Sequence, residues 1–149
     1  MPQSLSQILI HYVFSTKNRE RSIHDEYRNE LHAYVGGIVD EHKGALLAAG
    51  SVEDHIHLLV VQPRTISVAD LVQEIKTGSS KWIETKSGFS GFYWQNGYGA
   101  FSISPSHRPA LEKYFTGQAE HHRSVTFQEE YRRLLAKYQI EYDEKYVWD

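Results

Sequence analysis

Two histidines separated by one residue form the first pair in this sequence whose types and spacing could do chemistry. His55 and His57 lie in residues 52–61, an apolar run that predicts a buried β-strand. Side chains two positions apart on a strand point to the same face, so the two imidazoles should project together. Two such imidazoles on a rigid strand provide half of a divalent-metal site. The alternative is a solvated histidine pair on the polar face of an amphipathic strand, and the pair alone does not decide between the two.

Composition limits the chemistry that the rest of the chain can supply. The 149 residues fit one domain, residues 1–149, and 40% of them are hydrophobic, which is ordinary for a globular protein. The chain has no cysteine, which excludes disulfides, thiolate catalysis and cysteine-bound zinc. A metal would therefore be held by histidine, carboxylate, amide or water. The net charge of −3 gives no overall basic field, so binding to nucleic acid would need a local patch.

Hydropathy bears on the cellular location of the protein. No apolar run approaches the length of a membrane span, and the N-terminus has no signal-peptide pattern. We therefore expect a cytoplasmic protein without a membrane partner.

The elements that must position the histidine pair follow from periodicity. Residues 6–15 alternate as a first strand, which places His11 on the same sheet face as the pair. Ser22 opens a predicted helix with a capping box, and that helix ends before Gly44. The remaining predicted elements are a strand at 45–52 in a hairpin with the histidine strand, a helix from Ser67 to about Trp82 and a strand late in 92–103. This order predicts an α+β, ferredoxin-like (βαββαβ) antiparallel sheet with both helices on one face.

Several polar residues near these elements have two interpretations each. His11 is either packed or a further ligand, and Asp54 is either a turn residue or a partner of the histidines. Two pairs of cations could contact a DNA backbone, or could simply be solvated: Lys17 and Arg19 after the first strand, and Lys76 and Lys81 on the second long helix.

A helix near the C-terminus carries a second candidate group. Ser106 is its predicted cap, and residues 109–122 form the predicted helix. Tyr114 and Gln118 are four residues apart and share a helix face, and His121 lies near that face. A tyrosine on an amphipathic helix is more often a packing residue than a nucleophile. A last helix is predicted from Thr126 to about residue 138.

Four segments together resemble the His-hydrophobic-His single-tyrosine transposases of the insertion-sequence-200/605 type. The segments are residues 11–19 (HYVFSTKNR), 54–57 (DHIH), 94–102 (WQNGYGAFS) and 114–122 (YFTGQAEHH). The histidine pair alone is a weak signal, but the four segments in this order over nearly the whole chain are specific.

The resemblance implies a function and a set of residues. His55, His57 and Gln118 would bind a divalent metal, Mg or Mn, and Tyr114 would attack a single-stranded DNA phosphodiester to form a 5′-phosphotyrosine. The extra C-terminal helices would carry this tyrosine, the DNA ends would be hairpins, and the protein would be a homodimer. No fixed general base is evident, and water and His121 are both candidates.

Two other functions remain open at this point. The fold could belong to a catalytically silent nucleic-acid-binding domain, although the presence of His55, His57, Tyr114 and Gln118 argues against a decayed copy. It could also be a metal-dependent phosphodiesterase that uses water as the nucleophile and forms no covalent adduct with DNA.

Overall fold

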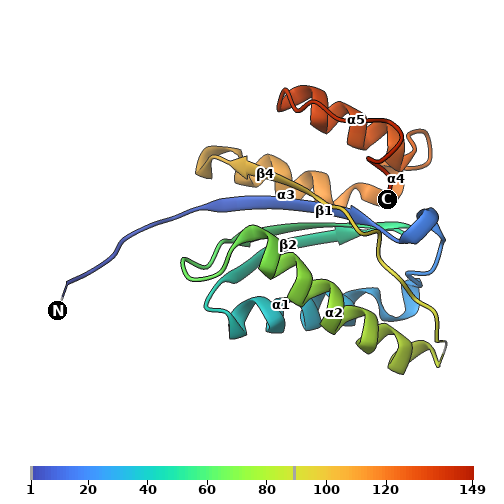
Figure 1. The fold of residues 1–149 in the computed structure, drawn as a ribbon, viewed down its shortest axis with the longest axis horizontal. Helices are drawn as coiled ribbons and strands as arrows, with labels where there is room; N and C mark the ends of the chain where they lie inside the picture. The colour runs from blue at the N-terminus through green and yellow to red at the C-terminus, as the bar shows by residue number, and fades with distance from the viewer. Residues whose placement is uncertain (1, 89) are drawn as a thin grey trace.

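Four antiparallel strands and two long helices form the frame that carries the histidine pair. The computed structural model describes residues 2–88 and 90–149. The strands are β1 (Leu9–Ser15), β2 (Ala45–Ser51), β3 (His55–Val61) and β4 (Gly99–Ile103), in the sheet order β2-β3-β1-β4. Helices α1 (Arg28–Glu41) and α2 (Val68–Ser87) follow β1 and β3 and cover one face of the sheet (Figure 1). The predicted ferredoxin-like α+β arrangement is confirmed, with β1 and β3 at its centre.

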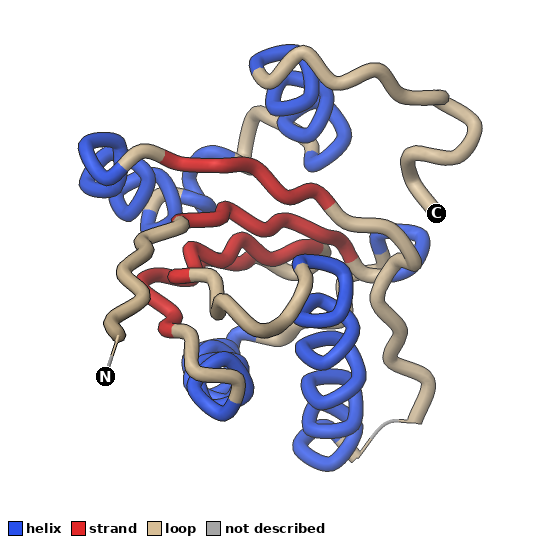
Figure 2. The backbone as a smooth tube through the Cα atoms, turned by 60° about the vertical axis from the view of Figure 1, so that its left-hand side comes forward, coloured by secondary structure: helices blue, strands red, loops and turns tan. Residues whose placement is uncertain are grey.

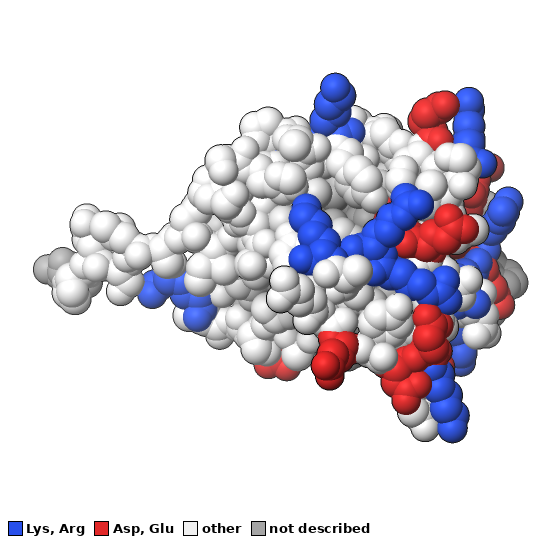
Figure 3. All heavy atoms as spheres, turned by 90° about the horizontal axis from the view of Figure 1, so that it is seen from above, with Lys and Arg blue, Asp and Glu red and all other residues white. Residues whose placement is uncertain are grey.

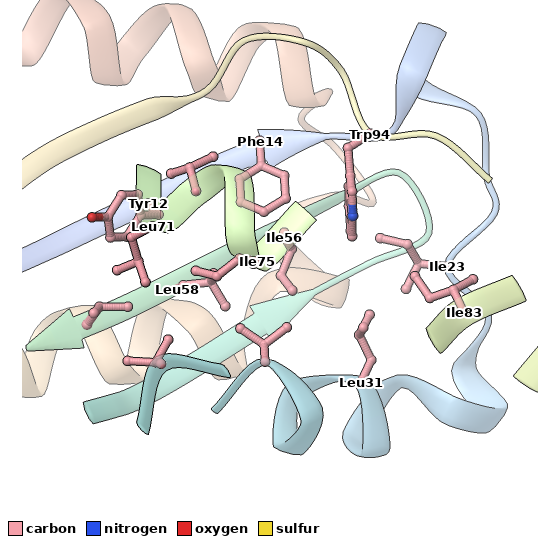
Figure 4. Close-up of a cluster of buried hydrophobic side chains, with 14 of the residues drawn as sticks. Tyr12, Phe14, Ile23, Leu31, Ile56, Leu58, Leu71, Ile75, Ile83 and Trp94 are labelled. Atoms are coloured by element: carbon pink, nitrogen blue, oxygen red, sulfur yellow. The ribbon is translucent and has the colours of Figure 1, made fainter. Parts of the chain in front are cut away.

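The face of the sheet toward α1 and α2 is an apolar core. Tyr12 and Phe14 of β1 and Ile56 and Leu58 of β3 are fully buried there against Leu31 of α1 and Ile75 of α2 (Figure 4). Burying each such side chain contributes about 1.5–3 kcal/mol. Because strand residues alternate between faces, this packing directs His11, His55 and His57 to the opposite face.

Three shorter helices cover that opposite face. They are α3 (Arg108–Thr116), α4 (Gln118–His121) and α5 (Phe127–Lys137), and the sheet forms a layer between them and the pair α1 and α2 (Figure 2). Leu111 and Phe115 of α3 pack on Leu59, and Tyr131 of α5 packs near Val13. The C-terminal helices therefore cover the face of the sheet that carries the histidines.

Two glycines allow this close approach. A Cβ atom on Gly50 of β2 would lie 2.9 Å from the Cα atom of Phe115, and one on Gly99 of β4 would lie 2.7 Å from the ring of Tyr131. Both distances are too short for a side chain. Glycine at these two positions therefore sets how near α3 and α5 come to the sheet.

Helix boundaries differ from the sequence prediction at several points. The Ser22 hydroxyl does not cap a helix, because the 3₁₀ turn η2 (Asp25–Tyr27) precedes α1. The helix predicted over residues 109–122 is interrupted at Gly117, and it follows the 3₁₀ turn η3 (Pro105–His107) without a cap from Ser106. Glycine has low helix propensity and so permits a break, but Gly36 and Gly37 lie within α1 without interrupting it, so propensity alone does not cause the break. The predicted caps Ser67 and Thr126 are confirmed, and each accepts a bond from a backbone N–H three residues later. A further 3₁₀ turn, η1 (Lys17–Arg19), follows β1.

No helix in the described part of the chain is both long enough and apolar enough to cross a membrane.

Candidate active site

The histidine pair is buried and held in a fixed orientation. Neither His55 nor His57 is exposed. His55 Nδ1 lies 2.7 Å from an Asp54 carboxylate oxygen, and His57 Nδ1 lies 2.8 Å from His11 Nε2. These bonds fix the rings, so both Nε2 atoms face the C-terminal helices. A carboxylate on the far nitrogen is the usual support of a metal-binding histidine.

Glu130 of α5 lies at the centre of the site, and sequence reasoning did not single it out. One of its oxygens is 3.2 Å from His55 Nε2 and 2.9 Å from His57 Nε2. Its other oxygen is 3.2 Å from His122 Nε2 and 3.3 Å from His121 Nε2. Only 2% of the residue is exposed. Histidines from β3, α4 and the residue after it therefore converge on one buried carboxylate.

A signal for Glu130 did exist in the sequence. The apolar stripe of α5 includes Phe127, Tyr131 and Leu135, and Glu130 is one turn from Phe127 on that inward side. A glutamate is almost never buried unless it has a partner. An acid on a buried stripe thus indicates a polar contact across the core, although the stripe does not say which residue makes it.

The tyrosine and glutamine predicted from the resemblance lie at this centre in the same chain. The Tyr114 hydroxyl donates a hydrogen bond to Glu130, and the Tyr114 ring centroid is 5.6 Å from that of His57. Gln118 is 1% exposed, and its Oε1 lies 3.0 Å from His55 Nε2. The break at Gly117 starts α4 at Gln118, and the side chain is turned into the site. The four residues His55, His57, Tyr114 and Gln118 are therefore brought together.

The carboxylate of Glu130 and the imidazoles around it shift one another's pKa values. Burial opposes ionisation of Glu130, but hydrogen bonds from His122, His55 and His57 hold its pKa well below the ordinary value. Burial also opposes protonation of His55, but Asp54 and Glu130 outweigh it and raise the pKa of His55 to about 9. Burial lowers the pKa of His57. These effects favour the ionised carboxylate of Glu130 and the protonated form of His55, and disfavour protonation of His57.

The tyrosine is protonated in this arrangement. Burial and the negative charge of Glu130 raise the pKa of Tyr114, and Gln118 and Arg133 oppose the shift only in part. A phenol in this state is a weak nucleophile. Activation would require a cation that offsets the charge on Glu130, because the low pKa of this carboxylate makes it a weak base for the phenolic proton.

The donor set fits a divalent ion. Donor atoms that share an octahedral ion at bonds of about 2.1 Å lie about 3.0 Å apart. The separations of His55 Nε2 from Gln118 Oε1 (3.0 Å) and of His57 Nε2 from Glu130 (2.9 Å) match that spacing. The ligand atoms of His55, His122 and Glu130 also lie within 4.8 Å of one another. His121 Nε2 lies 3.3 Å from Glu130 but makes no hydrogen bond with the described residues, which leaves a further ligand atom at the site.

The four predicted DNA-contacting cations lie away from this centre. Lys17 and Arg19 lie in η1, over the rings of Tyr93 and Trp148 respectively. Lys76 and Lys81 are on α2, on the other side of the sheet. The Lys76 ammonium donates to three backbone carbonyls in residues 95–97, and burial lowers its pKa to about 8. A DNA contact by any of the four stays a prediction.

The chain is similar to known transposases in sequence and in fold. The family described as Transposase IS200 like matches residues 4–118. A crystal structure of a Deinococcus radiodurans R1 protein, provisionally described as a transposase, has 20% identity and a TM-score of 0.61, covering 79% of this chain and 98% of that chain. A structure of a REP-associated tyrosine transposase bound to a REP hairpin has 14% identity and a TM-score of 0.59, covering 84% of this chain and 76% of that chain. No curated protein matches the sequence. Glu130 lies beyond the part of the chain that the family matches.

Proposed function

The chain belongs to the family of IS200-like transposases, and from this membership we propose that it cleaves and rejoins single-stranded DNA through a 5′-phosphotyrosine at Tyr114. The observation that carries the proposal is the contact of the Tyr114 hydroxyl with Glu130, which also contacts both His55 and His57. Packing of α3 on the sheet does not by itself require the Tyr114 hydroxyl to lie beside His55 and His57. Their meeting in one buried cluster favours chemistry over packing.

The proposed step exchanges one bond for another. The Tyr114 oxygen attacks phosphorus and forms a P–O bond, while the bond from phosphorus to the 3′-oxygen breaks. In the resting site the phenolic proton is hydrogen-bonded to Glu130, but the low pKa of this carboxylate makes it a weak base, so the proton passes to water as the P–O bond forms. The leaving 3′-oxygen takes up a proton. His121 is 28% exposed beside Glu130 and can deliver that proton from solvent. The reverse step, with a 3′-hydroxyl attacking the phosphotyrosine, rejoins strands without another energy source.

His55, His57 and Gln118 would hold a divalent ion, Mg or Mn, and Glu130 and His122 extend this set. Such an ion would polarise a phosphoryl oxygen and offset the charge that develops on it. The chain itself supplies the orientation, because Asp54 and His11 fix the two imidazoles.

We propose hairpin-bearing single-stranded DNA as the partner, because a protein of similar fold is known bound to a REP hairpin. We also propose a homodimer, as the resemblance implies. The Tyr114 of one chain already lies at its own histidines, so dimerisation would serve to hold two DNA ends and would not be required to complete the site.

Covalent capture tests the proposal. The protein is incubated with labelled oligonucleotides that carry imperfect hairpins with randomised single-stranded flanks, in Mg²⁺ or Mn²⁺, and is then denatured. We expect a DNA–protein adduct with the nucleotide on Tyr114 by peptide mass spectrometry. The adduct should disappear in Tyr114→Phe and in His55→Ala.

The matched control is Tyr131→Phe, which removes a hydroxyl from a buried tyrosine on the same side of the sheet. It should keep the adduct. Free cleaved product at wild-type yield from Tyr114→Phe would favour the metal-dependent phosphodiesterase. Binding without cleavage of any hairpin would favour the catalytically silent domain.

A further inference from the structure

A cavity of about 400 Å³ opens beside Tyr114, between α3, α5 and the end of β4. The side chains of Tyr114 and Glu130 form part of its wall, so the proposed nucleophile and the cavity share a boundary. Its volume lies in the range of about 300–1,000 Å³ that is typical of small-ligand sites. Whatever occupies this space is therefore next to the phosphate that Tyr114 would attack.

One side of the cavity suits a nucleobase. Its lining includes Ile103, Leu111 and Leu134, and the ring of Tyr138. The Tyr138 ring is stacked on Phe101 with centroids 4.7 Å apart, and its hydroxyl donates to the Ser102 carbonyl at 3.1 Å. The ring is thus fixed before a ligand arrives. Fixed aromatic and apolar surfaces bind unpaired bases with little dependence on sequence.

The rim of the cavity suits a phosphate. Arg133 and Lys137 are one turn apart on α5, are exposed, and line the cavity. Within residues 2–88 and 90–149 neither of them forms an ion pair, whereas the adjacent Arg132 is paired with Glu144 at 2.7 Å. Lys and Arg side chains gather over α5 in the view toward that helix (Figure 3). Arg133 and Lys137 are therefore available to contact the phosphates of a strand at the cavity.

We propose that this cavity binds the nucleotide that flanks the scissile phosphodiester, with its base against Tyr138 and the apolar wall and its phosphate at Arg133 and Lys137. The inference rests on the proposed function, because it requires Tyr114 to act on a DNA strand. The base must be unpaired to reach the wall, so the cavity also selects single strands over duplex. Helix α5 would then contribute both to the reaction centre and to the choice of the cleavage point.

Binding to a defined strand tests the cationic rim. The probe is a fluorescein-labelled single-stranded dT12, and its anisotropy is measured with Tyr114→Phe protein so that no adduct forms. Replacing Arg133 and Lys137 together by glutamine should weaken binding about tenfold at low salt. It should also reduce the slope of log K against log salt by about 1.4, because each lost contact to a single strand contributes about 0.7. The matched control replaces Lys43 and Arg64, which flank α1 and α2 outside the cavity, and should leave both quantities unchanged.

A second variant tests the base wall without altering charge. Ala110→Trp would fill the cavity from α3, and Ala136→Trp places the same side chain on an exposed position of α5 that does not line it. Wild-type binding should fall severalfold when dT12 is replaced by a strand of abasic nucleotides. Ala110→Trp should lose most of that difference, and Ala136→Trp should keep it.

The results separate this inference from the function on which it rests. If wild-type protein forms no adduct with any hairpin, the proposed function fails and takes the cavity proposal with it. If the Tyr114 adduct forms but the Arg133/Lys137 variant and Ala110→Trp bind dT12 as their controls do, only the cavity proposal is overturned.

Discussion

The two faces of the sheet differ in what they bury: one buries apolar side chains, and the other also buries a polar cluster. Toward α1 and α2, every fully buried strand residue is apolar or aromatic, and the core is continuous. Toward α3, α4 and α5, two smaller apolar clusters border a buried group of histidines around Glu130. A buried charge stabilises a fold little compared with apolar packing of the same volume. The first face therefore holds the fold together, whereas the second face buries polar side chains around Glu130 at the proposed active site.

The largest test of this division is Leu58→Ala, on the apolar face. Leu58 is fully buried in the core shared with α1 and α2. Its truncation should lower the free energy of unfolding by about 2–5 kcal/mol, because lost transfer energy and a cavity add together. Urea denaturation followed by circular dichroism measures the change. A loss below about 1 kcal/mol would mean that this face is not the main source of stability.

Gly50→Ala tests the close contact between β2 and α3. The added methyl would collide with the backbone at Phe115, next to Tyr114, so we expect a loss of about 1–3 kcal/mol and a weaker Tyr114 adduct. The matched control is Gly37→Ala in α1, where a Cβ atom would have no neighbour within 4 Å. That variant should gain about 0.5–1 kcal/mol from helix propensity. Equal effects of the two changes on thermal unfolding would contradict the close approach of α3 to β2.

Glu130→Gln acts on the reactive face. The variant keeps the side-chain volume but removes the charge that His55, His57 and His122 share. We expect Mn²⁺ affinity, measured by isothermal titration calorimetry, to fall about 10–100-fold, as it does when groups that support a metal site are removed. The free energy of unfolding should change less than in Leu58→Ala. Glu129→Gln, one residue earlier and exposed, is the control and should bind Mn²⁺ as the wild type does.

The sequence predicts correctly which strand residues point to each face of the sheet. Alternation in β1 and β3 determines which residues point each way, so the core positions Tyr12, Phe14, Ile56 and Leu58 and the outward histidines His11, His55 and His57 all follow from local pattern. Tyr114 and Gln118 follow from helix spacing together with the family resemblance. These are short-range properties of the chain.

Glu130 and the break at Gly117 depend on long-range packing. The apolar stripe of α5 places Glu130 and not Glu129 on the inward side of the helix. Only the docking of that helix on the sheet, allowed by Gly99, decides that the histidines become the partners of Glu130. Likewise Ser22 carries a capping pattern, but the tight turn at residues 25–27 takes the place of a cap. A local sequence pattern indicates which caps and buried positions a segment can form. Packing against the rest of the chain determines which of them form.

Two histidines give the smallest and most specific test of the comparison. His32 lies on α1, and among the described residues its hydrogen-bond partner is the Ser51 hydroxyl. Burial lowers the pKa of His32 to about 4, whereas carboxylates raise the pKa of His55 to about 9. Below about pH 6.5 the unfolded chain protonates His32 more readily than the folded chain does. Its contribution to stability is therefore complete above pH 6.5 and decreases as the pH falls toward 4. His32→Gln, which retains a hydrogen-bonding side chain, should show a smaller loss of unfolding free energy between pH 6.5 and 4 in urea titrations. If the unfolding free energy of His32→Gln depends on pH as that of the wild type does, burial does not lower the pKa of His32. The two faces would then not differ in how they shift the pKa values of their histidines.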